Sequence, residues 1–158
     1  DWIEAEVTPR QSSSDYNLRG NCHYPQPLPG ASGGQVICAD LRAGTGSYID
    51  FVRDVQTPGT YSLAATLSAG GSCTVLIDDV VDNAAQADTG YAMQTVGKIE
   101  PGSGGLKDVS IGVVTFDQPG LKLIRLMSDV PKQQMKIDRI QFLNGDQSTS
   151  PSKSRIFD

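Results

Sequence analysis

The sequence predicts an all-β fold, an antiparallel β-sandwich of the jelly-roll type. Apolar and polar residues alternate with a period of two along much of the chain, and no segment has the spacing of an amphipathic helix. These short segments recur roughly every 8–12 residues and are separated by turn sequences, among them TPG at residues 57–59 and QPG at residues 118–120. The 17 Gly and nine Pro residues also suit a fold with many turns.

About nine short strands follow from this alternation. The first is WIEAEV at residues 2–7, and a loop rich in Pro and Gly is expected at residues 17–34. In SYIDFVRDV, Phe51 falls on the core face and Asp50 on the opposite face. The polar segment 79–90 is expected to be a loop, with room for one helical turn at DNAAQA. The expected strands are residues 2–7, 35–41, 47–55, 60–67, 73–78, 92–99, 107–116, 121–127 and 136–143.

The later strands show the same alternation between turn signals. TYSLAATL follows the TPG turn and places Tyr61 and Leu63 on the core face. CTVLID follows the sequence AGG, KDVSIGVVTF follows the break GSGG, and LKLIRLM follows the QPG turn. KIDRIQFL closes the series, with Phe142 expected to face the core.

Length and charge limit the classes of protein. At 158 residues the chain fits one domain with a single core. We expect a module at residues 1–144 and a linker or tail at 145–158, which is rich in Ser, Pro and charged residues.

The net charge of −5 argues against binding to nucleic acid or to an anionic membrane surface. No apolar run reaches the roughly 18 residues of a membrane span, and because Asp1 directly precedes a strand-like run we expect a mature or excised chain.

The three cysteines, Cys22, Cys38 and Cys73, lack the spacing of a metal-binding finger. In an oxidising compartment they allow one disulfide and one spare thiol. Three buried free thiols are the alternative, and the odd count leaves both arrangements open.

Six segments, taken in order, resemble the carbohydrate-binding modules of families 6 and 35. The segments are IEAE at 3–6, GSYIDFVRDVQTPGTYSLAATL at 46–67, CTVLIDD at 73–79, TGYAMQTV at 89–96, the Pro-Gly turn with LKLIRL at 119–126, and KIDRIQF at 136–142. The resemblance spans about residues 1–143. It implies a galactose-binding-like β-sandwich, secreted or exposed at the cell surface or in the periplasm, that targets an attached glycoside hydrolase to polysaccharide.

The first and last strands contain a candidate calcium site. Glu4 and Glu6 are two residues apart, so on a strand both side chains leave the same face and repel each other. A bound calcium ion, which takes about six to eight oxygen ligands, would offset this repulsion and use both carboxylates as ligands. In the resembling modules a structural calcium is held by the first-strand motif, by an acidic residue of the last strand, which matches Asp138, and by loop carbonyls. The alternative is a solvated strand face whose carboxylates pair with Lys136 or Arg139.

The resemblance also implies a sugar site. In family 6 modules it is formed by an aromatic residue in the second-strand region, another shortly after a TG pair, and an amide before the last strand. Tyr91 follows the TG pair, and the amide falls at Gln133 or Gln134. Because VIC occupies the place of the first aromatic, Tyr24 or His23 of the preceding loop is expected to substitute for it.

Catalysis within this chain is not expected. The only His, His23, lies in a Pro-rich loop without a GxSxG elbow, and the same-strand pairs of carboxylates point side by side rather than across a cleft. We therefore expect a non-catalytic, monomeric module whose partners are a polysaccharide or oligosaccharide and an attached catalytic domain. Two other hypotheses remain: a structural or interaction sandwich without sugar affinity, and a small lyase or hydrolase on the jelly roll.

Overall fold

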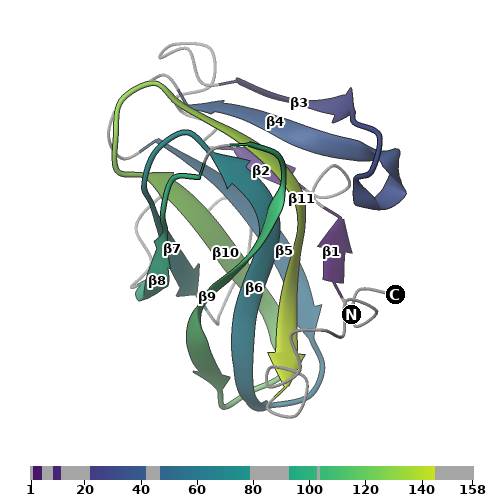
Figure 1. Cartoon of the computed structure of the whole chain (residues 1–158). Helices are drawn as coiled ribbons and strands as arrows, with labels where there is room; N and C mark the ends of the chain where they lie inside the picture. Colours follow the sequence, from purple (N-terminus) through teal and green to yellow (C-terminus); the bar gives the residue numbers. More distant parts are fainter. Residues whose placement is uncertain are drawn as a thin grey trace.

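The computed structural model shows two antiparallel sheets packed face to face (Figure 1), which confirms the predicted β-sandwich. No helix in the described part of the chain is long and apolar enough to cross a membrane. The expected linker at 145–158 and the expected loop at 79–90 lie outside the described residues. The described residues are 2–4, 9–11, 22–41, 47–78, 93–102 and 104–144, with the backbone only at 2–4, 9–11, 22–25 and 40–41.

The six-stranded sheet has the order β3-β4-β11-β6-β9, and β1 also pairs with β11. Its strands are β1 (Trp2–Glu4), β3 (Cys22–Pro27), β4 (Gln35–Leu41), β6 (Gly59–Ala69), β9 (Lys107–Phe116) and β11 (Gln133–Asn144). The five-stranded sheet has the order β2-β5-β10-β7-β8. Its strands are β2 (Pro9–Gln11), β5 (Tyr48–Val55), β7 (Cys73–Asp78), β8 (Gln94–Ile99) and β10 (Gly120–Ser128). One short 3-10 turn, η1 (Ser32–Gly34), precedes β4.

The expected loop at 17–34 is wrong in part, because it contains β3. This strand pairs with β4 over its whole length, from Cys22 opposite Asp40 to Pro27 opposite Gln35. Proline cannot donate to a strand neighbour, so it is tolerated at the edge of a sheet, where alternate amides point away from the neighbour. β3 is such an edge strand, and its prolines are two residues apart.

The core lies between the two sheets and is built from alternating strand positions. Phe51 is fully buried, as predicted, and Phe142 is buried as well. Tyr61 is half-buried and packs on Phe116 and Phe142, with ring centroids 6.0 and 5.9 Å away. Such tilted and edge-on aromatic contacts are favourable, so the predicted core faces of β5, β6 and β11 are confirmed.

The edges of the two sheets meet along one side of the sandwich, where β8 and β9 lie side by side (Figure 1). A methyl group on Gly97 would overlap the carbonyl oxygen of Ile111, and one on Gly112 would overlap the carbonyl oxygen of Val96. Only glycine permits the two backbones to approach this closely. These two glycines therefore allow the edge strands of the two sheets to pack against each other on this side of the domain.

The first and last strands are neighbours, as expected. Glu4 of β1 lies opposite Arg139 of β11, on the side of β11 away from β6. Further along the same side, β4 pairs with β11 up to Ile137. The register between β11 and β6 shifts between Ile137 and Arg139, which makes Asp138 the extra residue of a β-bulge. The bulge thus lies where the neighbour of β11 changes from β4 to β1.

Candidate functional site

A groove of about 370 Å³ lies on the six-stranded sheet near the start of β11. Cys38 and Lys136 alternate with the core residues Ile37 and Ile137, so they leave the face that points away from the core. The groove therefore opens on the outer face of the sheet. Its lining residues come from β3, β4, β6 and β11 and from the connections after β6 and β8: Gln26, Cys38, Ala39, Ser68, Ala69, Gly70, Gly102, Gly104, Gln134, Met135 and Lys136.

The strand register brings these distant residues together. Cys38 of β4 lies opposite Lys136 of β11, which in turn lies opposite Ser68 of β6. On the other side of Cys38, the backbone of β3 places Tyr24 opposite it. Residues directly opposite each other in antiparallel strands project on the same face of a sheet. One row of positions thus crosses four strands through the groove.

The groove presents polar groups suited to a ligand rich in hydroxyls. The Cys38 thiol donates to Oε1 of Gln26 at 2.7 Å, which leaves the Gln26 amide nitrogen as a free donor. Gln134 and Lys136 are exposed, and Ser68 is half-exposed beside them. Together these side chains offer amide, hydroxyl and ammonium groups within one concave surface, which is the usual composition of a small-ligand site.

The two glutamines expected before the last strand have different surroundings. Gln133 is 1% exposed; its Oε1 accepts the Gly71 backbone N–H at 2.9 Å, and its Nε2 donates to the Ser72 carbonyl at 3.3 Å. Its amide is thus engaged within the domain. Gln134 is exposed and lines the groove. Of the two residues, Gln134 is the one whose side chain is available to a ligand.

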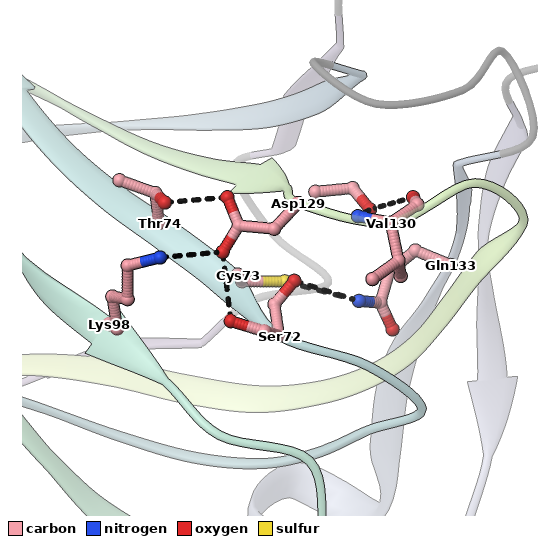
Figure 2. A network of polar contacts seen from close by, with 8 residues as sticks. Ser72, Cys73, Thr74, Lys98, Asp129, Val130 and Gln133 are labelled. Carbon is pink, nitrogen blue, oxygen red and sulfur yellow. Dashed lines mark hydrogen bonds and ion pairs between the residues drawn. The ribbon is translucent and has the colours of Figure 1, made fainter.

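A polar network fixes the turns at this end of the domain (Figure 2). The Asp129 carboxylate accepts hydrogen bonds from the hydroxyls of Ser72 at 2.8 Å and Thr74 at 2.6 Å, and from the Lys98 ammonium at 3.3 Å. In Figure 2, Ser72 and Cys73 lie between Asp129 and Gln133, and Oε1 of Gln133 accepts the backbone N–H of Gly71 in the β6–β7 turn. The turn between β6 and β7 is therefore held from two sides, and it carries Gly70, one wall of the groove.

Two pKa values respond to this network. Burial tends to raise the pKa of the Asp129 carboxyl, but the hydrogen bonds from Thr74, Ser72 and Lys98 and the positive charge of Lys98 lower it below its ordinary value. Burial raises the pKa of the Cys73 thiol to about 12, and the Asp129 charge adds to this effect. Cys73 is thus a protonated, structural thiol at neutral pH rather than a nucleophile. Cys38 and Cys73 are both buried thiols without a disulfide bond in the described part of the chain.

The remaining sugar-site residues expected from the sequence are only partly described. The backbone of β3 places His23 opposite Ala39 and Tyr24 in the row that crosses the groove. Tyr91 lies outside the described residues. Sequence reasoning missed Gln26 and Ser68 as groove residues and considered Lys136 only as an ion-pair partner. Local sequence carries no signal for them, because the groove depends on pairing between distant strands.

Two of the three expected calcium ligands, Glu4 and Asp138, occupy adjacent register positions on β1 and β11. Asp138 is 2% exposed, and its Oδ2 accepts the backbone N–H of Ser32 at 3.0 Å. Glu4 is placed one position away, opposite Arg139, by the backbone of β1, while Glu6 lies outside the described residues. Among the residues that are described, no group of three or more His, Cys, Asp or Glu side chains is arranged to hold a metal.

Comparison with solved structures finds this fold in carbohydrate-active proteins. The chain matches a Paenibacillus xanthan lyase with a TM-score of 0.63 and 19% identity over 93% of its own length, and it spans 13% of that enzyme. It matches the CBM22-2 xylan-binding domain of Xyn10C from Paenibacillus barcinonensis with a TM-score of 0.62 and 9% identity, over 90% of this chain and 98% of that domain. The carbohydrate-binding module CBM36, in a complex with calcium and xylotriose, gives a TM-score of 0.53 and 16% identity over 90% and 98%.

No family model and no curated protein matches the sequence. At identities of 9–19% the structural matches establish the fold. Two of these structures are a carbohydrate-binding module and a xylan-binding domain, and the chain spans 98% of each. The chain therefore has the two-sheet β-sandwich fold of carbohydrate-binding modules.

Proposed function

We propose that this chain is a non-catalytic carbohydrate-binding module and that the groove on the six-stranded sheet is its ligand site. The observation that carries the proposal is the convergence of Gln26, Ser68, Gln134 and Lys136 in one concave surface. Amides and hydroxyls are donors and acceptors at once, so they match the paired donor and acceptor character of sugar hydroxyls. The shared fold with a xylan-binding domain supports this assignment.

Tyr24 is our candidate for the aromatic surface of the site. Sugars present apolar faces that stack on aromatic rings, and the described residues that line the groove include no aromatic. The β3 backbone places Tyr24 opposite Cys38, at the end of the row that crosses the groove. With Tyr24 there, the groove would combine a stacking surface with hydrogen-bonding groups.

Such a module would act for a larger secreted enzyme. Its binding energy would hold an attached glycoside hydrolase near its polysaccharide, which raises the local concentration of the catalytic domain without adding chemistry. The match to a segment of a xanthan lyase, 13% of that chain, supports an accessory role.

Direct binding measurements test this proposal. Affinity electrophoresis and isothermal calorimetry on a panel of plant, algal, fungal and bacterial polysaccharides should reveal at least one ligand. Gln134→Ala and Tyr24→Ala should each weaken that binding about tenfold, as expected for the loss of one well-placed contact. Gln118→Ala is the matched control, because Gln118 is exposed in the turn between β9 and β10 and does not line the groove. Silence across the whole panel would favour a structural or interaction domain instead.

We also propose a structural calcium ion bound between the two terminal strands. The donor chemistry fits, because the buried Asp138 carboxylate lies at the bulge where β1 begins to pair with β11, and Glu4 is one register position away. Calcium prefers carboxylate and carbonyl oxygens in flexible geometry. Glu4, Glu6 and Asp138 would hold the ion, and its charge would offset the repulsion among them. The matched module in complex with calcium supports this proposal.

Thermal unfolding with and without a chelator tests the metal. Calcium should raise the melting temperature, because an ion that binds only the folded state stabilises it. Glu4→Gln and Asp138→Asn should remove the calcium-dependent part of the shift. Asp117→Asn, at an exposed turn position, should leave it intact. The same melting temperature in calcium and in chelator would rule out the ion.

A further inference from the structure

Lys136 occupies the middle of the groove. It lies between Cys38 and Ser68 in the row that crosses the sheet, and it is exposed although both of its neighbouring strands are interior to the sheet. A lysine stem of four methylene groups covers sheet surface well, while the ammonium group reaches the opening. The cation is therefore part of the surface that any ligand of the groove must contact.

The Lys136 ammonium has no ion pair in the described part of the chain. The ion pairs found there belong to Lys98, Arg125 and Arg139 instead. The described residues that line the groove also include no Asp or Glu, although the chain carries 18 acidic residues and a net charge of −5. Within the described residues, the concave surface of this acidic protein thus carries a lysine ammonium and no carboxylate.

The flanking groups suit an anionic sugar. Gln26 and Gln134 lie among the residues around Lys136 and can bond the hydroxyls of a sugar ring. A neutral sugar offers the ammonium only hydroxyl acceptors, whereas a carboxylate gives it a charge-assisted hydrogen bond, which is about twice as strong. The groove therefore offers one cation among several neutral polar groups. A sugar acid is complementary to it, because it carries one carboxylate among several neutral hydroxyls.

We infer that the ligand of this groove is an acidic polysaccharide, with a uronic acid residue whose carboxylate binds Lys136. This inference rests on the proposed function and specifies its ligand class. Lys136 is then the residue that determines specificity: it discriminates between a sugar acid and the neutral sugar of the same stereochemistry. The carboxylate also draws the ligand toward the groove against the negative charge of the rest of the domain, so binding weakens as salt rises.

Paired ligands test the inference. Oligogalacturonate and glucuronoxylan oligosaccharides are each titrated by calorimetry beside their carboxyl-reduced counterparts. We expect at least one acidic oligosaccharide to bind about tenfold more tightly than its reduced partner. Lys136→Gln should remove most of this preference, because it should weaken binding of the acidic oligosaccharide far more than binding of its reduced partner, and Lys136→Arg should retain it. Lys132→Gln, which removes the same charge from an exposed turn outside the groove, should leave the preference intact.

Three results would overturn the inference, and they differ in whether the proposed carbohydrate-binding function survives. Equal affinity for acidic and reduced oligosaccharides would exclude an acidic ligand and keep a carbohydrate-binding groove. Equal losses in the Lys136→Gln and Lys132→Gln variants would assign the preference to net charge instead of to the groove. Absence of binding to any acidic or neutral saccharide would remove the proposed function itself.

Discussion

Asp50 and Arg125 form a two-pronged ion pair across β5 and β10, on the outer face of the five-stranded sheet. Nε of Arg125 lies 2.8 Å from one carboxylate oxygen of Asp50, and Nη2 lies 2.9 Å from the other. The guanidinium also covers the ring of Tyr48, with 3.5 Å between Cζ and the ring centroid. The Asp50 side chain is 1% exposed, so Arg125 keeps a buried carboxylate compensated.

Replacing Arg125 with Met should therefore destabilise the domain strongly. The stem volume is largely kept while the charge partner of a buried carboxylate is lost, which costs about 3 kcal/mol or more. Urea unfolding at neutral pH measures the change. Lys98→Met is the matched control: the Lys98 side chain is 58% exposed, and such surface pairs contribute about 0–1 kcal/mol. Equal losses in the two variants would contradict the assignment.

Gly97→Ala should open the side where the two sheets meet. The added methyl group would overlap the carbonyl oxygen of Ile111, so the backbones of β8 and β9 must separate. Overpacking of this kind costs about 1–3 kcal/mol. Gly105→Ala supplies the comparison, since its methyl group would enter open space, and we expect a change within about 0.5 kcal/mol. Thermal unfolding of both variants distinguishes the two positions.

Gln133 and Gln134 should separate stability from binding. Gln133→Ala leaves the buried Gly71 N–H without its acceptor, at a cost of about 1–3 kcal/mol. Gln134→Ala, at an exposed position, should change stability by less than about 0.5 kcal/mol and reduce ligand affinity. Unfolding and binding are measured on both variants. We expect a loss of stability in Gln133→Ala and a loss of ligand affinity in Gln134→Ala. A ligand role for Gln133 would instead appear as lost affinity in a variant of normal stability.

Acid should weaken the network around Asp129. Its pKa is lower in the folded state than in the unfolded chain, so the folded state binds fewer protons. The stability from this group is present above the unfolded-state pKa of about 4 and is lost as the pH falls through the lower, folded-state pKa. Asp129→Asn should lower stability at pH 7 and flatten its decline below about pH 4. Unfolding curves across this pH range check both effects.

Local pattern was enough to predict most strands. The segments 35–41, 73–78 and 107–116 were expected and observed with identical limits, because each is rich in apolar and β-branched residues and is bounded by turn residues. β3 escaped prediction because its prolines normally break a strand, and their tolerance depends on edge position, which is a property of the assembled sheet. Closeness of the first and last strands was expected as part of the calcium site that the resemblance implies, and the structure shows the two strands paired.

The groove was predictable only in part. Gln134 was found through the resemblance to known modules, which places an amide before the last strand. Lys136 and Ser68 were not, because they meet across β11 and β6, which are far apart in the sequence. Strand register depends on the packing of whole faces rather than on any local motif. Sequence reasoning therefore identified Gln134 but not the cationic character of the groove.

The edge strands of the two sheets determine whether copies of this domain can pair when they lie close together. An open strand edge is a template for pairing with another copy, which leads to aggregation. Here β3 carries two prolines, β2 has only three residues, and β8 and β9 block each other at Gly97 and Gly112. These four edge strands of the described sheets are thus blunted by three different means. Under the proposed function, many copies would therefore bind side by side on one polysaccharide chain without joining their sheets.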